Sequence, residues 1–229
     1  MTGRALSGRR IMVLGGTGSL GHAVTGRFRD DGASVLVADA RPPAAERRHQ
    51  DVEYTTVDVL DEASVAAAFA MSPPPRAVVN LIGGYTPPQA LAGLDLSVLR
   101  QQLELNLVTA AIVTKHAMPL LAAQDGGPIV HVSSRVATEK GENGFAYSVS
   151  KLGVVRLVEA AAAEGREQRV RVNCIMPSII DTPANRAAMP NARHHRWPKP
   201  TELAAVLAFL VSDDATLISG AAIPVYGLA

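Results

Sequence analysis

The chain has 229 residues, of which 48% are hydrophobic and 19% are charged, and its formal net charge is +1. This length suits one sizeable α/β domain, and the balanced charge excludes a general attraction to nucleic acid or to an anionic membrane. The single cysteine, Cys174, excludes an intrachain disulfide framework and lies in an apolar run typical of a buried core thiol. We expect neither a signal peptide nor a membrane-spanning run of about 20 apolar residues, and therefore a cytoplasmic protein.

Short apolar strands alternate with helical patterns along the chain. The predicted strands are Ile11–Leu14, Ser34–Ala38, Val52–Val57, Ala77–Ile82, Ile129–Val132, Val170–Ile175 and Ala222–Val225. The predicted helices are Leu20–Asp30, Glu62–Ala70, Ser97–Leu121, Tyr147–Glu164 and Thr201–Val211. This alternation predicts an α/β fold with a single, doubly wound parallel sheet of about seven strands and helices on both faces. One domain over residues 1–229 is therefore the predicted organisation.

The segment 184–200 lacks a clear period and carries basic and aromatic side chains without an acid, namely Arg186, Arg193, His194, His195, Arg196, Trp197 and Lys199. It follows the sixth predicted strand, on the side where open α/β sheets bind ligands. Long loops in compact domains are often functional. We interpret the segment as a substrate lid suited to an anionic or polar substrate, and we expect no metal site at the two adjacent histidines.

A glycine-rich turn follows the first strand and opens the first helix. Its residues are Gly15, Gly16, Thr17, Gly18, Ser19, Leu20 and Gly21, and they contain the pattern G-x-G-x-x-G. Such glycines allow a tight turn, backbone approach to a pyrophosphate and close helix–strand packing, and the helix N-terminus faces the anion. The turn predicts dinucleotide binding, with a glycine-rich turn that binds no ligand as the alternative.

An acid, Asp39, ends the second strand at the distance expected for a ribose-binding carboxylate. It would accept hydrogen bonds from the adenosine ribose and repel a 2′-phosphate, which favours NAD(H). Arg41, Arg47 and Arg48 follow it and could instead attract that phosphate, which keeps NADP(H) possible; a solvated basic loop is the other reading of these arginines.

Tyr147 and Lys151 are four residues apart on a predicted helix and therefore share one face. A phenol is a poor acid–base catalyst near neutrality because its pKa is about 10. A neighbouring ammonium stabilises the phenolate, so we expect Lys151 to lower the pKa of Tyr147. A solvated helix face is the alternative interpretation of this pair alone.

The chain also carries Ser134, thirteen residues before Tyr147, and Asn106 within Leu105-Asn106-Leu107. Together with the glycine turn and Tyr-x-x-x-Lys, these residues resemble the short-chain dehydrogenase/reductase family (classical type), nearly from end to end. The resemblance extends to Asp58-Val59 at an adenine site, to Asn80 and Gly83 at the end of the fourth strand, and to Pro177, Ile180 and Thr182 in the loop over the nicotinamide.

The resemblance implies an NAD(P)-dependent oxidoreductase that transfers hydride between nicotinamide and a small carbonyl or alcohol substrate. Tyr147 would be the general acid/base, Ser134 would hydrogen-bond the reacting oxygen, and Lys151 would also hold the nicotinamide ribose. Asn106 would anchor a water that relays protons through Lys151. Taken alone, Ser134 could merely end a strand, Asn106 could be a satisfied polar group, and Thr182 could form a turn.

A narrower set of residues is similar to the dihydropteridine reductase branch of this family. It comprises Tyr85 after a glycine pair, Asn185-Arg186 before Met189-Pro190, and Trp197-Pro198. That resemblance implies an NADH-dependent reductase of quinonoid dihydropterins, with Tyr85, Arg186, Arg193 and Trp197 as candidate substrate residues. Ser134 is the departure, because that branch lacks the catalytic serine.

A third possibility is a cofactor-binding scaffold that has lost its chemistry; the intact set of Asn106, Ser134, Tyr147 and Lys151 argues against it. The resemblance also implies a homodimer or homotetramer, assembled through long helices rich in Ala, Val and Leu.

Overall fold

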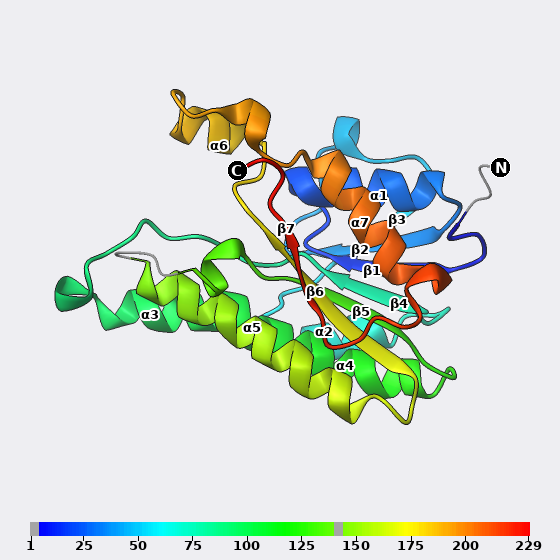
Figure 1. Cartoon of the computed structure of the whole chain (residues 1–229). Coiled ribbons are helices and arrows are strands. Elements are labelled where there is room, and N and C mark those ends of the chain that lie inside the picture. Colours follow the sequence, from blue (N-terminus) through cyan, green and yellow to red (C-terminus); the bar gives the residue numbers. More distant parts are fainter. Residues whose placement is uncertain (1–4, 140–143) are drawn as a thin grey trace.

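The computed structural model describes residues 5–139 and 144–229. Seven parallel strands form one sheet in the order β3–β2–β1–β4–β5–β6–β7 (Figure 1). The strands are β1 (Arg10–Leu14), β2 (Ser34–Asp39), β3 (Val52–Thr56), β4 (Ala77–Asn80), β5 (Gly127–Val132), β6 (Val170–Pro177) and β7 (Ala222–Val225). The strand order reverses between β1 and β4, and ligands of open α/β sheets bind at such a point.

Helices cover both faces of this sheet, with α1 and α7 on one face and α2, α4 and α5 on the other (Figure 1). The helices are α1 (Ser19–Asp30), α2 (Glu62–Phe69), α3 (Leu96–Leu103), α4 (Thr109–Ala122), α5 (Phe145–Glu164), α6 (Pro183–Ala188) and α7 (Pro200–Val211). All seven predicted strands are present, each within a few residues of its expected bounds. The predicted fold class, a doubly wound parallel sheet, is confirmed.

The central strands bury both of their faces, because alternate residues belong to two different cores. In β1, Met12 and Leu14 pack toward α2, α4 and α5, whereas Ile11 and Val13 pack toward α1 and α7. Each such buried aliphatic side chain contributes about 1.5–3 kcal/mol, which explains why the strands are continuously apolar. Cys174 lies in the core between the sheet and the helices α2, α4 and α5, and it is 0% exposed, as predicted. Burial raises the pKa of its thiol to about 12.

The long helix predicted over Ser97–Leu121 is interrupted by one wider turn. α3 leads into a π-helical turn, Glu104–Val108, which continues as α4. π-helical turns inside α-helices are frequent at functional sites. The turn contains Asn106, whose side chain is 1% exposed and faces the protein interior.

Within the described residues, one helix, Leu96–Ala122, is long and apolar enough to cross a membrane, contrary to our expectation that no segment qualifies. Its most apolar window has a mean hydropathy of 1.3, and 39% of that window is buried. Core helices of water-soluble proteins meet the same criterion, and here α4 packs against α2 and the strands β4 and β5. The finding therefore carries little weight for a membrane location.

The segment 184–200 is more regular than the sequence predicts. It begins within α6, contains the 3₁₀ turn His194–Arg196, and ends at the first residue of α7. The hydroxyl of Thr182 starts α6 by accepting a hydrogen bond from the Asn185 N–H at 3.2 Å. A six-residue helix is too short to show a clear hydrophobic period, which explains why α6 could not be predicted from the sequence.

Candidate active site

The glycine-rich turn lies at the carboxyl end of β1, where the strand order reverses. Gly15 has φ +76, a conformation that favours glycine, and a methyl group there would lie 3.1 Å from Leu81 and Ile82, which directly follow β4. A methyl group at Gly21 would lie 2.5 Å from the backbone of Gly15 and Gly16. Both glycines therefore allow the turn, α1 and β4 to approach one another closely.

The N-terminus of α1 is open above this turn. Gly18, its N-cap, makes no side-chain cap, is exposed, and has no atom within 4 Å of the position that a Cβ would take. Ser19 is exposed and Leu20 is half-buried. The first N–H groups of a helix have no partner within it, and they attract phosphate. This opening fits a dinucleotide pyrophosphate.

Asp39, the last residue of β2, contacts the glycine-rich turn. Its carboxylate accepts hydrogen bonds from the Thr17 N–H at 3.0 Å and the Thr17 hydroxyl at 2.7 Å, and from the Ala40 N–H at 2.8 Å. Arg41, next along the chain, is exposed. Thr17 therefore fixes the orientation of the carboxylate at the edge where an adenosine ribose would lie.

The residues of the predicted adenine site follow β3, the neighbour of β2. Asp58 is exposed, and its carboxylate accepts a hydrogen bond from the Leu60 N–H at 3.0 Å. Val59 is half-buried and packs against the core beneath α2. The two residues thus lie at the same edge of the sheet as Asp39.

Tyr147, Lys151 and Ser134 meet at the carboxyl ends of β5 and β6. Lys151 Nζ lies 5.9 Å from the centroid of the Tyr147 ring and donates a hydrogen bond to the Val132 carbonyl at 3.1 Å. Ser134 follows β5, and its side chain lies close enough to that of Tyr147 to lower the pKa of the phenol. The backbone beneath is held by Ser133, whose hydroxyl donates to the Lys151 carbonyl at 2.7 Å.

Burial dominates the protonation of this pair. Burial raises the pKa of Tyr147; the hydrogen bond to Ser134 lowers it, and Tyr85 raises it further. Burial also lowers the pKa of Lys151 to about 8. We expected Lys151 to lower the pKa of Tyr147, and in this structure the net shift is the opposite. The cause is that desolvation disfavours both charged forms.

Asn106 faces Lys151 across Gly83. The Asn106 amide accepts a hydrogen bond from the Gly84 N–H at 3.0 Å and donates to the Gly84 carbonyl at 3.1 Å. A methyl group at Gly83 would lie 2.7 Å from both Asn106 Oδ1 and Lys151 Nζ. The missing side chain of Gly83 therefore keeps open the space between these two polar groups.

Three buried polar residues around this site were not singled out from the sequence. Gln102 and Ser150 contact Asn106, and His131 contacts Asn80 at the end of β4. Gln102 lies four residues before Asn106, so two amides on one face of a largely apolar helix were a signal in the sequence. The sequence carries no comparable sign for Ser150 and His131.

The loop after β6 approaches the site from the other side. Pro177 is the last residue of β6, pairs with Val225 and is buried, and Ile180 is half-buried. The Ile180 carbonyl accepts a hydrogen bond from Asn185 Nδ2 at 2.8 Å, and Thr182 caps α6. The Thr182 hydroxyl thus has a structural partner in addition to its predicted role toward nicotinamide.

A cavity of about 200 Å³ lies beside Tyr147. Its walls are largely apolar and are formed by the loop after β4, by α3, and by the approach to α5; they include Tyr85, Leu94, Val98, Val136 and Ala146. The ring of Tyr85 meets that of Tyr147 edge-on, with 5.2 Å between centroids. Of the four candidate substrate residues, Tyr85 is the one at this cavity.

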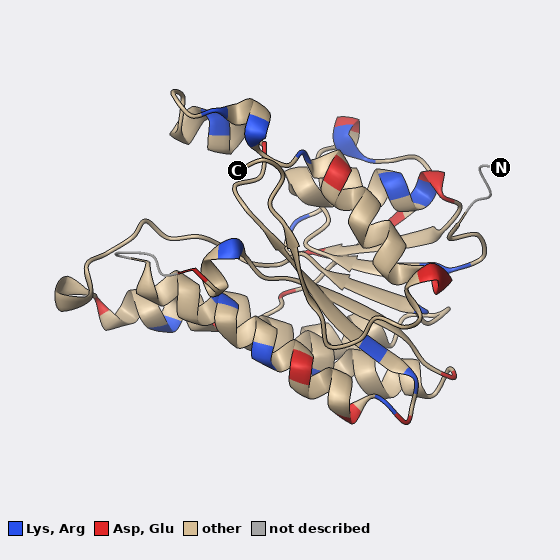
Figure 2. Cartoon of the chain, in the orientation of Figure 1, with Lys and Arg blue, Asp and Glu red and all other residues tan. Residues whose placement is uncertain are grey.

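The other three candidate substrate residues belong to the segment after β6. Both oxygens of the Asp181 carboxylate bind the Arg186 guanidinium, at 2.5 and 2.8 Å. Arg193 is exposed, and Trp197 is only 7% exposed and packs against the ring of His194. Figure 2 shows Lys and Arg along this part of the chain, around α6. Trp197 therefore has a packing role, and Arg186 already has a carboxylate partner.

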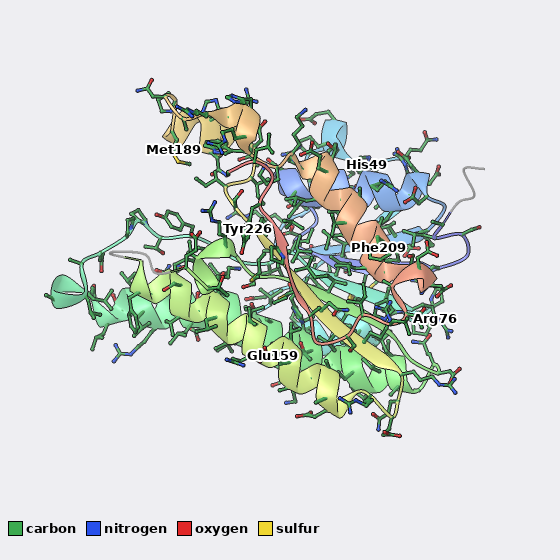
Figure 3. The ribbon with its side chains drawn as sticks, viewed as in Figure 1. His49, Arg76, Glu159, Met189, Phe209 and Tyr226 are labelled. Atoms are coloured by element: carbon green, nitrogen blue, oxygen red, sulfur yellow. The ribbon has the colours of Figure 1, made fainter. Side chains whose placement is uncertain are left out.

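A larger groove of about 990 Å³ lies at the opposite, amino ends of the strands. Arg76 and Glu159, both labelled in Figure 3, are among the residues that line it. Two of its arginines are paired, Arg9 with Asp213 and Arg169 with Asp125. The groove lacks Tyr147, which lines the smaller cavity, and it also lacks Ser134 and Lys151, the neighbours of Tyr147. We therefore assign the active site to the smaller cavity on chemical grounds.

Comparison with known proteins agrees with this geometry. A family model described as enoyl-(acyl carrier protein) reductase matches residues 15–227. The chain is 31% identical to a cis-4-hydroxycyclohexanecarboxylate dehydrogenase from Sinomonas cyclohexanicum, over 98% of each chain. It is 27% identical to a 7alpha-hydroxysteroid dehydrogenase from Bacteroides fragilis, over 95% of this chain and 92% of that protein. A short-chain dehydrogenase/reductase structure from Mycobacterium ulcerans superposes with a TM-score of 0.88 and 26% identity, over 97% of this chain and 90% of that one.

The fold, the site and these matches define a nicotinamide-dependent oxidoreductase. The chain belongs to the short-chain dehydrogenase/reductase family. The two relatives named above are dehydrogenases of alcohols, and enzymes of this family generally use a tyrosine as the acid–base group.

Proposed function

We propose that this protein is an NAD(H)-dependent dehydrogenase of small cyclic secondary alcohols, or a reductase of the corresponding ketones. The observation that carries the proposal is the meeting of Tyr147, Ser134 and Lys151 beside an apolar cavity, next to an open glycine-rich turn. The nicotinamide ring supplies or accepts the hydride when the dinucleotide is bound.

Tyr147 is the acid–base group in this proposal. It donates its proton to the carbonyl oxygen during reduction, or takes the proton of the alcohol during oxidation. The Ser134 hydroxyl hydrogen-bonds the same oxygen and stabilises the negative charge that develops on it. Burial of Tyr147 supports the role, because a desolvated phenol keeps its proton until substrate and cofactor change its surroundings.

Lys151 and Asn106 would relay protons to and from Tyr147. Lys151 is 4% exposed, and a pKa of about 8 lets it gain or lose a proton near neutrality. Its position near Gly83 also suits contact with the nicotinamide ribose. Asn106 faces Lys151 across Gly83 and is placed to hold a water for proton relay.

Cofactor binding is proposed at the glycine turn and at the neighbouring strand ends. The residues that would hold the dinucleotide are those of the open turn, Gly15, Thr17, Gly18, Ser19, Leu20 and Gly21, with Asp39 and Arg41, Asp58 and Val59, Asn80 and Gly83, and Pro177, Ile180 and Thr182. The oriented Asp39 carboxylate supports NAD(H), since it would repel a 2′-phosphate. The exposed Arg41 is the residue that would favour NADP(H) instead.

The substrate class rests on the cavity and on one relative. A volume of about 200 Å³ with mostly apolar walls suits one small ring. The relative from Sinomonas cyclohexanicum is named for a hydroxycyclohexane carboxylate, a cyclic secondary alcohol. The segment 184–200, with Arg186 and Arg193, stays a proposed lid, and its positive charge would favour substrates that carry a carboxylate.

The experiment is a fluorescence titration of the protein with NADH and with NADPH, for the natural chain and for Asp39→Ala. We expect tighter binding of NADH, and at least a tenfold loss in the variant, because the ribose hydroxyls lose a charged acceptor. Preference for NADPH would contradict the role of Asp39. Binding of neither dinucleotide would overturn the proposed function and favour a scaffold.

A substrate screen follows on the same protein. NAD⁺ with substituted cyclohexanols should give NADH, whereas quinonoid dihydropterin with NADH should be turned over more slowly. Faster turnover of the pterin would favour the alternative function, a dihydropterin reductase.

A homodimer or homotetramer and a cytoplasmic location complete the proposal. The outer faces of the long helices expose apolar side chains, including Val108 at 43% and Leu152 at 37%. Such a face is stabilised when it is covered by a second copy.

A further inference from the structure

Gln102 is a buried polar side chain that the mechanism above does not use. It lies on α3, one turn before Asn106, and is 2% exposed. Its amide nitrogen donates a hydrogen bond to Thr86 Oγ1 at 2.6 Å. Its amide oxygen accepts a hydrogen bond from Asn106 Nδ2 at 3.2 Å. One side chain thus joins Asn106 to the loop after β4.

The partners of Asn106 fix the orientation of its amide. Asn106 Nδ2 faces three oxygens: the Gly84 carbonyl at 3.1 Å, Gln102 Oε1 at 3.2 Å and Ser150 Oγ at 3.1 Å. A carbonyl oxygen can only accept, and the Ser150 hydroxyl already donates to the Tyr147 carbonyl at 2.8 Å. A flipped Asn106 amide would place its oxygen against these acceptors, so only one orientation is compatible with the network.

Thr86 connects the same network to the substrate cavity. It is half-buried and lines the cavity of about 200 Å³ beside Tyr147. The loop that contains it also contributes Tyr85, Pro87, Pro88, Gln89 and Leu94 to the walls. Gln102 is the direct side-chain link between this wall and Asn106 among the hydrogen bonds of the described residues.

We propose that Gln102 is a positioning residue, which holds the amide of Asn106 and the cavity wall at Thr86 in one fixed relation. This inference rests on the proposed function, because it assigns Asn106 to the proton relay. Loss of Gln102 would remove one of three acceptors from Asn106 and the donor from Thr86. Proton transfer would slow, while the dinucleotide site at the glycine turn would be unaffected.

The test compares Gln102→Leu with Gln101→Leu. Gln101 is the neighbouring residue on α3 and is exposed, so its variant repeats the chemical change without touching the network. We expect kcat for alcohol oxidation to fall about tenfold in Gln102→Leu, and the Kd for NADH to stay within about twofold. The solvent deuterium isotope effect on kcat should rise, because proton transfer becomes slower.

Variants of Thr86 provide a second test, which leaves the hydrogen bond between Gln102 and Asn106 in place. Thr86→Val removes the hydroxyl and should lower kcat in the same direction, and Thr86→Ser should recover most of the loss. Because both residues act through one contact, Gln102→Leu combined with Thr86→Val should lose less than the product of the two single effects.

The outcomes separate this inference from the proposed function. Absence of turnover in the natural chain with every alcohol and ketone tested would overturn the proposed function, and this inference with it. Turnover in the natural chain, with Gln102→Leu indistinguishable from Gln101→Leu or with no change in the isotope effect, would overturn the positioning role of Gln102 alone.

Discussion

Lys151 and Tyr147 show that burial, and not charge attraction alone, sets the chemistry of the active site. The Lys151 ammonium donates a hydrogen bond to the Val132 carbonyl, so part of its charge is directed away from the phenol. Desolvation then raises the pKa of Tyr147 and lowers that of Lys151. The catalytic pair therefore depends on the space above it, which is bounded by Gly83.

Gly83→Ala tests that space. The added methyl group would lie 2.7 Å from both Asn106 Oδ1 and Lys151 Nζ, so one or both of these side chains must move. We expect kcat/KM to fall at least tenfold. Gly93→Ala is the matched control, since no atom lies within 4 Å of its added carbon. Equal activity of the two variants would show that this space is not used.

At the scale of secondary-structure elements, hydrogen-bonded side chains join α4 to the ends of two strands. His131 on β5 contacts Asn80 on β4 through Nδ1 at 3.3 Å and Thr114 on α4 through Nε2 at 3.0 Å. Thr114 donates its own proton to the Ala110 carbonyl at 2.8 Å, so His131 acts as the donor to Thr114 and accepts from Asn80. A neutral imidazole satisfies every member of this chain, and a charged one does not.

His131 predicts a dependence of stability on pH. Burial lowers the pKa of His131 from 6.5 to about 4, with Lys151 contributing. Below about pH 6.5 the unfolded chain binds a proton that the folded chain excludes until about pH 4, so the free energy of unfolding falls through this window. The full shift corresponds to about 3 kcal/mol.

Urea unfolding at about pH 7 and about pH 5 measures this effect. The loss of stability between the two should be about 2 kcal/mol smaller in His131→Asn than in the natural chain. His195→Asn, at an exposed histidine of the 3₁₀ turn His194–Arg196, should behave like the natural chain. The same loss in all three proteins would contradict the account of His131.

At the scale of the whole molecule, the glycine-rich turn lies where the strand order reverses between β1 and β4, and the catalytic residues lie at the carboxyl ends of β5 and β6. Hydrophobic cores on both faces of the sheet support these strands. The fold leaves the outer faces of α4 and α5 uncovered, with Leu107 already packed against Gly153 between the two helices. Val108, at the end of the π-helical turn before α4, and Leu152 on α5 are among the exposed large apolar side chains. Association of two copies through this face would bury them.

Sedimentation of Val108→Glu and Leu152→Glu tests the association. We expect both variants to have a smaller mass in solution than the natural chain, because a buried unpaired carboxylate disfavours the contact. Leu60→Glu, at a side chain that is 52% exposed before α2, should leave the assembly unchanged. A natural chain that sediments as a monomer, or variants that match it, would contradict this interface.

Much of this structure could be predicted from the sequence, because the strands are short apolar runs and the motifs have fixed spacing. The seven strands and the shared helix face of Tyr147 and Lys151 follow from such local patterns, whereas the place of Ser134 beside them was implied by the family resemblance. The π-helical turn around Asn106 does not, since its residues have no distinctive helical propensity and its geometry depends on packing against Gly84.

The sequence also could not show which polar groups are already satisfied. Trp197 and Arg186 were reasonable substrate residues in a basic segment, but one packs against His194 and the other binds Asp181. Gln102 was overlooked for the converse reason, because its partner Thr86 lies sixteen residues away in a loop. Long-range contacts decide these roles, and residue spacing alone does not report them.

The acid–base role of Tyr147 is tested by the rate of NADH formation from NAD⁺ and a cyclic secondary alcohol, measured for the natural chain and for Tyr147→Phe. We expect a loss of about 10²–10⁴-fold in kcat for the variant, with the Kd for NADH unchanged, because only the acid–base group is removed. A variant that keeps its rate within about threefold would show that Tyr147 is not the acid–base group and would contradict the proposed function.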